Sequence, residues 1–209
     1  MRVLSQLLGT TVLVNCLGIF SAASADCTPD TTDGSLPSGT IITCSGVDAD
    51  GFIASTQDDV TLNVQAGADV AVGIYLDNDA TVVNAGDITS STDRGIEVDL
   101  RGDVTNSGTI TINDDAQDGI NTDDDTTVLN TGTITTNGLD SDGIDVDDDS
   151  IVTIGNGGIV RTTGDSAGGI LAGERSTVNV LAGGLVSSEG AVDGGVTDSH
   201  GVLLDEAGG

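Results

Sequence analysis

Residues 95–144 read GIEVDLRGDVTNSGTITINDDAQDGINTDDDTTVLNTGTITTNGLDSDGI, and this stretch decides the fold. It holds two copies of one pattern, which begin with Gly-Ile at Gly95 and at Gly119. In each copy an Asn-x-Gly-x-Ile segment starts eleven positions after that glycine, at Asn106 and at Asn130. A fixed period of about 20 to 50 residues is typical of a solenoid, in which each repeat forms one coil.

The pattern continues on both sides of this stretch. The repeat glycine, followed by a large apolar residue, recurs at spacings of 22, 22, 24, 24, 26 and 32 residues, at Gly51, Gly73, Gly95, Gly119, Gly143, Gly169 and Gly201. Nine positions after each of the first six glycines stands a valine: Val60, Val82, Val104, Val128, Val152 and Val178. The Asn-x-Gly-x-Ile segments end at Ile88, Ile110 and Ile134, and a fifth repeat keeps the motif one residue late, as Asn156-Gly157-Gly158-Ile159.

Within each repeat the apolar residues alternate with polar ones. Ile96 and Val98, for example, flank Glu97, and this spacing of two is that of a strand with one face buried. Three such short strands and three turns account for one repeat, and the extra residues of the longer repeats enter between the Asn motif and the next glycine, where a loop absorbs them. We therefore expect an all-β protein, a right-handed single-stranded parallel β-helix with three sides and about six coils of 22–32 residues.

The composition agrees with a narrow solenoid interior and excludes some partners. The chain has 34 Asp and Glu against 5 Lys and Arg, a net charge of −29, and only three aromatic residues. Nucleic acids and anionic membranes are bound through clusters of Lys and Arg, so we expect neither as a partner. Columns of Val and Ile fill an interior that aromatic rings would overfill.

The N-terminal region carries the pattern of an export signal. Arg2 precedes a mostly apolar run, and residues 23–25 are small, so we expect residues 1–25 to be a cleaved signal peptide. Cys27 and Cys44 then remain, and an even pair in an exported chain predicts a disulfide. The expected organisation continues with an N-terminal cap that holds this disulfide over residues 26–50, and with coils over residues 51–209.

Two polar columns follow from the stacking of coils. Asn84, Asn106 and Asn130 predict a ladder of side-chain amides at a turn, although residues of this type also simply tolerate turn dihedrals. Four positions after the repeat glycine stands an aspartate in five repeats: Asp77, Asp99, Asp123, Asp147 and Asp205.

Stacked carboxylates repel one another, and two explanations remain open. Water and splayed side chains are the simpler one, and calcium, which takes six to eight oxygen ligands, is the other. The candidate calcium ligands lie where the acids are densest: Asp123, Asp125, Asp145, Asp147 and Asp149. The chain has neither the glycine-rich nonapeptide of calcium-binding β-rolls nor an EF-hand loop.

The signal peptide, the early cysteine pair and the alternating Asn-x-Gly-x-Ile and Gly-Ile segments resemble the passenger domain of bacterial autotransporters. The resemblance covers residues 26–209 and implies an exported β-helix at the bacterial surface or outside the cell, with a structural or adhesive role. It also implies an outer-membrane β-barrel translocator as a partner, and a host or matrix surface as a further one. No barrel pattern follows the seventh repeat before Gly209, so we expect a C-terminally truncated fragment of a longer protein.

Catalysis is the alternative, because β-helical lyases and hydrolases of polysaccharides resemble the chain in fold. A lyase needs a base and cations that neutralise an acidic substrate. The chain has no lysine, and Arg94, Arg101, Arg161 and Arg175 share no column position. The single histidine, His200, stands before a repeat glycine and is expected in a turn. We therefore expect no enzyme, while a calcium-stabilised surface-binding protein remains a further possibility.

Overall fold

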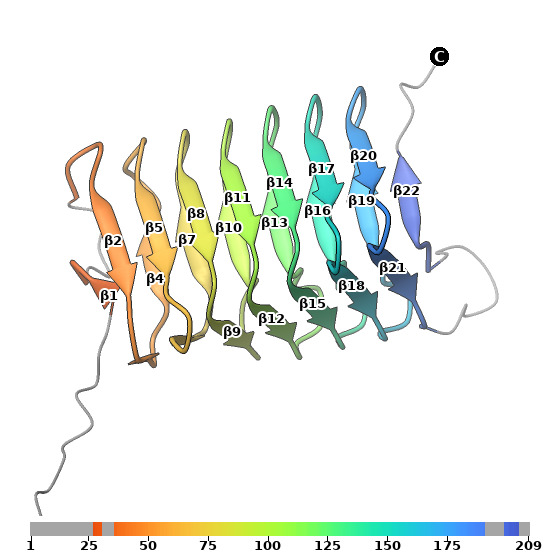
Figure 1. Cartoon of the computed structure of the whole chain (residues 1–209), viewed down its shortest axis with the longest axis horizontal. Helices are drawn as coiled ribbons and strands as arrows, with labels where there is room; N and C mark the ends of the chain where they lie inside the picture. The colour runs from red at the N-terminus through yellow and green to blue at the C-terminus, as the bar shows by residue number, and fades with distance from the viewer. Residues whose placement is uncertain (1–26, 31–35, 191–198, 205–209) are drawn as a thin grey trace, which may run out of the picture.

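The computed structural model describes residues 27–30, 36–190 and 199–204. The expected signal peptide and Asp205 lie outside these residues. The described residues form strands and turns without a helix, so they contain no helix that could cross a membrane. Three sheets run along the long axis of the molecule, and successive coils lie side by side from β2 to β22 (Figure 1). The predicted parallel β-helix is confirmed.

The chain passes through sheet C, sheet A and sheet B in turn within each full coil. Sheet A consists of β1 (Cys27–Thr28), β2 (Ile41–Cys44), β5 (Thr61–Val64), β8 (Thr81–Asn84), β11 (Asp103–Asn106), β14 (Thr127–Asn130), β17 (Ile151–Ile154) and β20 (Thr177–Val180). Sheet B consists of β3 (Val47–Asp48), β6 (Asp69–Ala71), β9 (Asp87–Ser90), β12 (Thr109–Ile112), β15 (Thr133–Thr136), β18 (Ile159–Thr162) and β21 (Leu185–Ser188). Sheet C consists of β4 (Phe52–Ala54), β7 (Ile74–Leu76), β10 (Ile96–Val98), β13 (Ile120–Thr122), β16 (Ile144–Val146), β19 (Ile170–Ala172) and β22 (Val202–Leu204).

Like residues stack on like in the interior. Ile96 pairs with Ile120, and Val104 pairs with Val128, in parallel register. Most strands alternate buried and outward side chains, as the spacing of two predicted. Among the described residues the core is built of Ile, Val, Leu, Ala and Cys with one aromatic ring, Phe52. Aliphatic columns therefore supply most of the apolar burial.

The repeat glycine marks the closest approach between coils. A Cβ atom at Gly119 would lie 2.4 Å from the carbonyl oxygen of Gly143, and one at Gly95 would lie 2.5 Å from that of Gly119. Those same carbonyls accept the N–H groups of Ile120 and Ile96, so they cannot move away. Only glycine fits directly before β4, β7, β10, β13, β16 and β19, and this explains the Gly-Ile signature. At Gly201, before the last strand β22, a Cβ atom would meet nothing within 4 Å.

The register differs from the sequence pattern in three places. The first coil begins at β2, ahead of Gly51, because β2 pairs in parallel with β5 and β3 with β6. Leu62, and not Val60, pairs with Val82. Val160, and not Ile159, pairs with Ile134, because the turn between β17 and β18 is two residues longer than the three corresponding turns directly before it.

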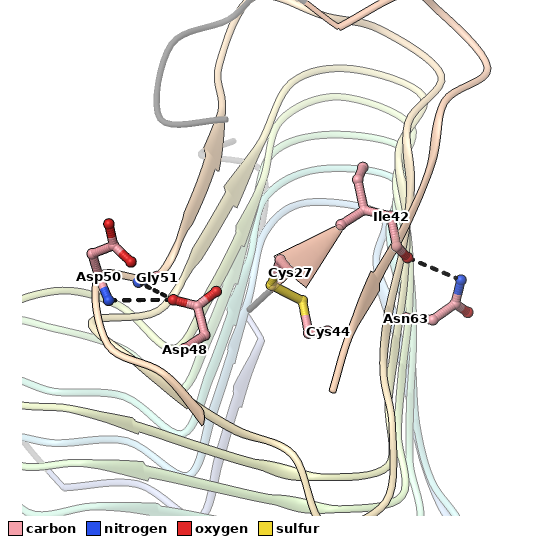
Figure 2. Close-up of a disulfide and its surroundings, with 7 residues drawn as sticks. All are labelled: Cys27, Ile42, Cys44, Asp48, Asp50, Gly51 and Asn63. Carbon is pink, nitrogen blue, oxygen red and sulfur yellow. Dashed lines mark hydrogen bonds between the residues drawn. A yellow bond between two sulfur atoms is a disulfide. The ribbon is translucent and has the colours of Figure 1, made fainter. Parts of the chain in front are cut away.

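The N-terminal end of the solenoid is covered by β1, which pairs antiparallel with β2. A disulfide joins Cys27 of β1 to Cys44 of β2, and both sulfurs are buried at the edge of the core (Figure 2). Cys44 lies in the inward column that continues through Val64 to the ladder asparagines. The covalent bond therefore holds the covering strand onto the first coil.

The asparagine ladder runs through three buried positions of sheet A. The Asn84 Nδ2 donates to Asn106 Oδ1 and the Asn106 Nδ2 donates to Asn130 Oδ1, each over 2.8 Å. The ladder ends where Ile154 occupies the next position, and Asn130 Nδ2 there donates to the Ile159 carbonyl over 3.1 Å. A side-chain amide is both a donor and an acceptor, so stacked asparagines can satisfy one another's hydrogen bonds along the axis.

Replacing the central amide tests this ladder. Asn106→Leu keeps the branched shape of the side chain but leaves Asn84 Nδ2 and Asn130 Oδ1 buried without their partner, so we expect a loss of about 3 kcal/mol in unfolding free energy. Thr105→Val, at the adjacent outward position, is the control and should change little. Urea unfolding followed by circular dichroism measures both, and an equal effect of the two changes would contradict the ladder's role.

Candidate functional site

Charge is distributed unequally over the three sides of the solenoid. The outward charged residues on the strands of sheets A and B are few: Asp69, Asp87, Asp103 and Arg161. The strands of sheet C carry only Glu97 and Asp145, and most of the charge lies in the turns on either side of that sheet, whereas the turns between sheets A and B in the described ranges carry none. We call the following set the acidic face: Asp77, Glu97, Asp99, Asp118, Asp123, Asp142, Asp145 and Asp147. These side chains act on one another through space, as their effects on the pKa values of Asp99 and Asp145 show.

The centre of the acidic face contains one guanidinium group. Arg94 Nη1 lies 2.6 Å from Glu97 Oε1, and Arg94 Nε lies 3.6 Å from Asp118 Oδ2. On the neighbouring strands Asn121 is in register with Asp145, and Asn121 Nδ2 donates to Asp145 Oδ2 over 3.3 Å. One cation is thus shared among several half-buried or buried carboxylates.

Burial and crowding shift the titration of these carboxyls. Burial raises the pKa of Asp118 to about 6, and the backbone N–H of Asp142 and the Arg94 guanidinium only partly oppose this. Burial, together with repulsion from Asp118, Asp142 and Asp147, raises the pKa of Asp145 to about 7. Burial also raises the pKa of Asp142. Perturbed carboxyl pKa values of this kind are a feature of functional sites and of structural charge networks alike.

Many of the stacked aspartates bond to the backbone of the next coil. Asp118 Oδ1 accepts the N–H of Asp142 over 2.8 Å, and Asp142 Oδ1 in turn accepts the N–H of Gly168 over 2.5 Å. A parallel column does the same, since Asp124 Oδ1 accepts from Asp148 and Asp148 Oδ1 from Glu174. These hydrogen bonds give the carboxylates a structural role and offset part of their repulsion.

The turn that leads from sheet C to sheet A holds a further column. Asp79, Arg101, Asp125, Asp149 and Arg175 all have left-handed backbone conformations there, with φ of 57 to 62°. Arg101 binds Asp79 through two nitrogens over 2.7 and 2.9 Å, and Arg175 binds Asp149 in the same way over 2.7 Å. The interpretation that the four arginines share no column is therefore wrong for Arg101 and Arg175.

The five candidate calcium ligands do not converge. Asp145 points outward from β16, Asp123 and Asp147 follow the ends of their strands, and Asp125 and Asp149 occupy the left-handed column. Within the described ranges, no three of them bring carboxyl oxygens within 4.8 Å of one another. The geometry gives the calcium hypothesis no coordination shell among these residues.

One group of three metal-type ligands does lie together in the described part of the chain. It consists of Cys27, Cys44 and Asp48, all buried. Both sulfurs are used in the disulfide, and Asp48 Oδ1 accepts the N–H groups of Asp50 and Gly51 (Figure 2). These three residues therefore have a structural role at a corner of the first coil.

The role of Arg94, Asp118 and Asp142 at the centre of the acidic face was not predicted from the sequence. A signal was present, because each of them directly precedes a repeat glycine, as does His200. The His200 carbonyl oxygen accepts the N–H of Gly169, in keeping with the expected turn position.

The fold and its charged side define an acidic β-helical domain of three sides. A family model described as the BigA third pectate lyase-like domain matches residues 44–208, and the chain belongs to this family of bacterial surface-protein domains. No curated protein and no solved structure matches the chain.

Asp145 offers a test of the crowded carboxyls. Its pKa in the folded protein is raised from the ordinary aspartate value to about 7. Between these two pH values the folded protein binds a proton at Asp145 that the unfolded chain does not bind. The free energy of unfolding that this proton contributes is therefore present at low pH and lost as the pH rises through about 7. We expect Asp145→Asn to stabilise the chain by on the order of 2 kcal/mol near pH 8 and to have little effect near pH 4.

Melting curves across that pH range measure the effect. Asp103→Asn removes the same charge from sheet A and is the matched control. The assignment is wrong if the two variants shift the melting temperature in parallel at every pH.

Proposed function

We propose that this chain is the passenger-type β-helix of an autotransporter, with a structural or adhesive role at the bacterial surface and no catalysis of its own. The export signal at residues 1–25 would take it across the inner membrane, and an outer-membrane β-barrel translocator would complete the route. Membership in a family of bacterial surface-protein domains supports the location. The observation that carries the structural role is the continuous stack of coils, which forms an elongated body from β2 to β22 (Figure 1).

The state of the arginines argues against a lyase. The four that lie in the described residues all pair with carboxylates: Arg94 with Glu97 and Asp118, Arg101 with Asp79, Arg161 with Glu189, and Arg175 with Asp148, Asp149 and Glu174. An acidic polysaccharide needs unpaired cations to neutralise its carboxylates, and the acidic face would repel it.

A β-helical polysaccharide hydrolase is the second candidate. It is favoured by the pair Asp118 and Asp145, because a hydrolase uses one protonated and one ionised carboxyl, and their raised pKa values would allow this near neutral pH. Against it, Asp118 already holds Arg94 and the backbone N–H of Asp142, so its oxygens are engaged in the structure.

Surface display can be tested by labelling intact cells that produce the full-length protein. Leu139 lies in an insertion loop and is 46% exposed, so Leu139→Cys should react with a membrane-impermeant maleimide. Val128→Cys, at a fully buried position, should react only after denaturation. Labelling of Leu139→Cys only in lysed cells would contradict surface display.

The absence of catalysis can be tested with the purified protein and a panel of acidic and neutral polysaccharides. We expect no release of reducing ends and no unsaturated product, and Asp118→Asn and Asp145→Asn should match the unchanged chain. Turnover that both substitutions abolish would favour the hydrolase instead.

A further inference from the structure

The acidic face is hollowed near its N-terminal end. A shallow, open hollow lies over β4, β7 and the turn before β10. Its walls include the side chains of Ile53, Val72 and Tyr75, and its rim carries three carboxylates, Asp50, Asp93 and Glu97, and the guanidinium group of Arg94. The hollow thus combines apolar and aromatic walls with an excess of negative charge.

The positive charge in the hollow is already used. Arg94 bonds Glu97 over 2.6 Å and faces Asp118 at 3.6 Å, outside the hollow. Glu97 is therefore also engaged, and Asp50 and Asp93 remain as exposed carboxylates at the rim. The Asp93 Oδ1 accepts the backbone N–H of Arg94, which orients that carboxylate without neutralising it.

The side of the solenoid on which the hollow lies is also the charged one. A protein that used its negative charge only for solubility would have no reason to gather it on one side, yet the turns that flank sheet C are rich in aspartate and the described turns between sheets A and B carry no charged residue. At the opposite edge of sheet C, just after its strands, a row of aspartates runs along the axis at one per coil, about 4.8 Å apart. Asp77, Asp99, Asp123 and Asp147 form this row.

We propose that the acidic face binds a basic, extended segment of a partner protein, with one Lys or Arg side chain of that segment inserted in the hollow. The hydrocarbon stem of such a side chain packs against Ile53 and Val72, its cationic group lies against the ring of Tyr75, and Asp50 and Asp93 bind the charged end. The row of aspartates holds the next basic residues. This deepens the adhesive role proposed above and rests on it.

Other ligands fit these walls less well. A metal ion needs several oxygens that converge, and no acidic group in the described ranges outside the disulfide corner meets that requirement. An anionic glycan would be repelled by the whole row. A long basic side chain is the ligand that matches both the apolar walls and the carboxylate rim.

The test uses the purified chain and a fluorescent decapeptide of alternating Arg and Gly, with binding followed by anisotropy. Asp50→Asn together with Asp93→Asn should weaken binding about tenfold. Asp69→Asn together with Asp87→Asn removes the same charge from the exposed side of sheet B and should weaken it by less than about twofold.

Tyr75→Ser distinguishes binding in the hollow from general electrostatic attraction to the acidic face. Loss of the ring should weaken binding about threefold without a change in net charge. The proposal is overturned if the two double variants weaken binding equally, if Tyr75→Ser has no effect, or if the peptide does not bind. Circular dichroism and melting temperature confirm that each variant folds, and because the assay uses purified protein, its outcome is independent of surface display.

Discussion

The vertical register of the coils is the constraint on which the rest of this structure depends. Backbone hydrogen bonds between successive coils set their separation, and the glycine before each strand of sheet C lets the backbones meet at that separation. A Cβ atom at Gly119 would lie 2.4 Å from the Gly143 carbonyl oxygen, so the approach tolerates no side chain. Every column of the solenoid, apolar or polar, follows from this fixed spacing.

Stacking places each polar side chain beside others of its own kind, and the donors and acceptors of each residue type decide which hydrogen bonds form. Asparagine both donates and accepts, so Asn84, Asn106 and Asn130 bond one another in the buried core. Aspartate only accepts, so Asp118 and Asp142 take backbone N–H groups from the next coil instead. At Asp145, which accepts from the Asn121 side chain, burial and the neighbouring carboxylates still raise the pKa.

The same stacking produces a surface with one chemically distinct side. Sheets A and B present mostly threonine and aliphatic residues, while the acidic face gathers carboxylates around Arg94 and Tyr75. A binding surface that repeats once per coil is suited to an extended partner, whereas a catalytic centre requires a few groups that converge on one point. The arrangement of charge therefore supports the proposed binding of an extended, basic partner more than the hydrolase alternative.

The sequence by itself determined the fold class, the alternation within strands, the glycine column and the position of the asparagine ladder, because each of these repeats at a fixed interval along the chain. Only the tertiary structure decided that β2 already forms a coil, that Val160 replaces Ile159 in the inward column, and that Arg101 and Arg175 share a corner. The physical reason is that the register between coils depends on the three-dimensional path of each turn, which the interval between motifs along the chain does not show. Two extra residues in a turn leave the spacing of motifs almost unchanged, yet they alter which side chain points inward. Arg94, Asp118 and Asp145 likewise come from three different repeats, and no spacing within one repeat brings them together.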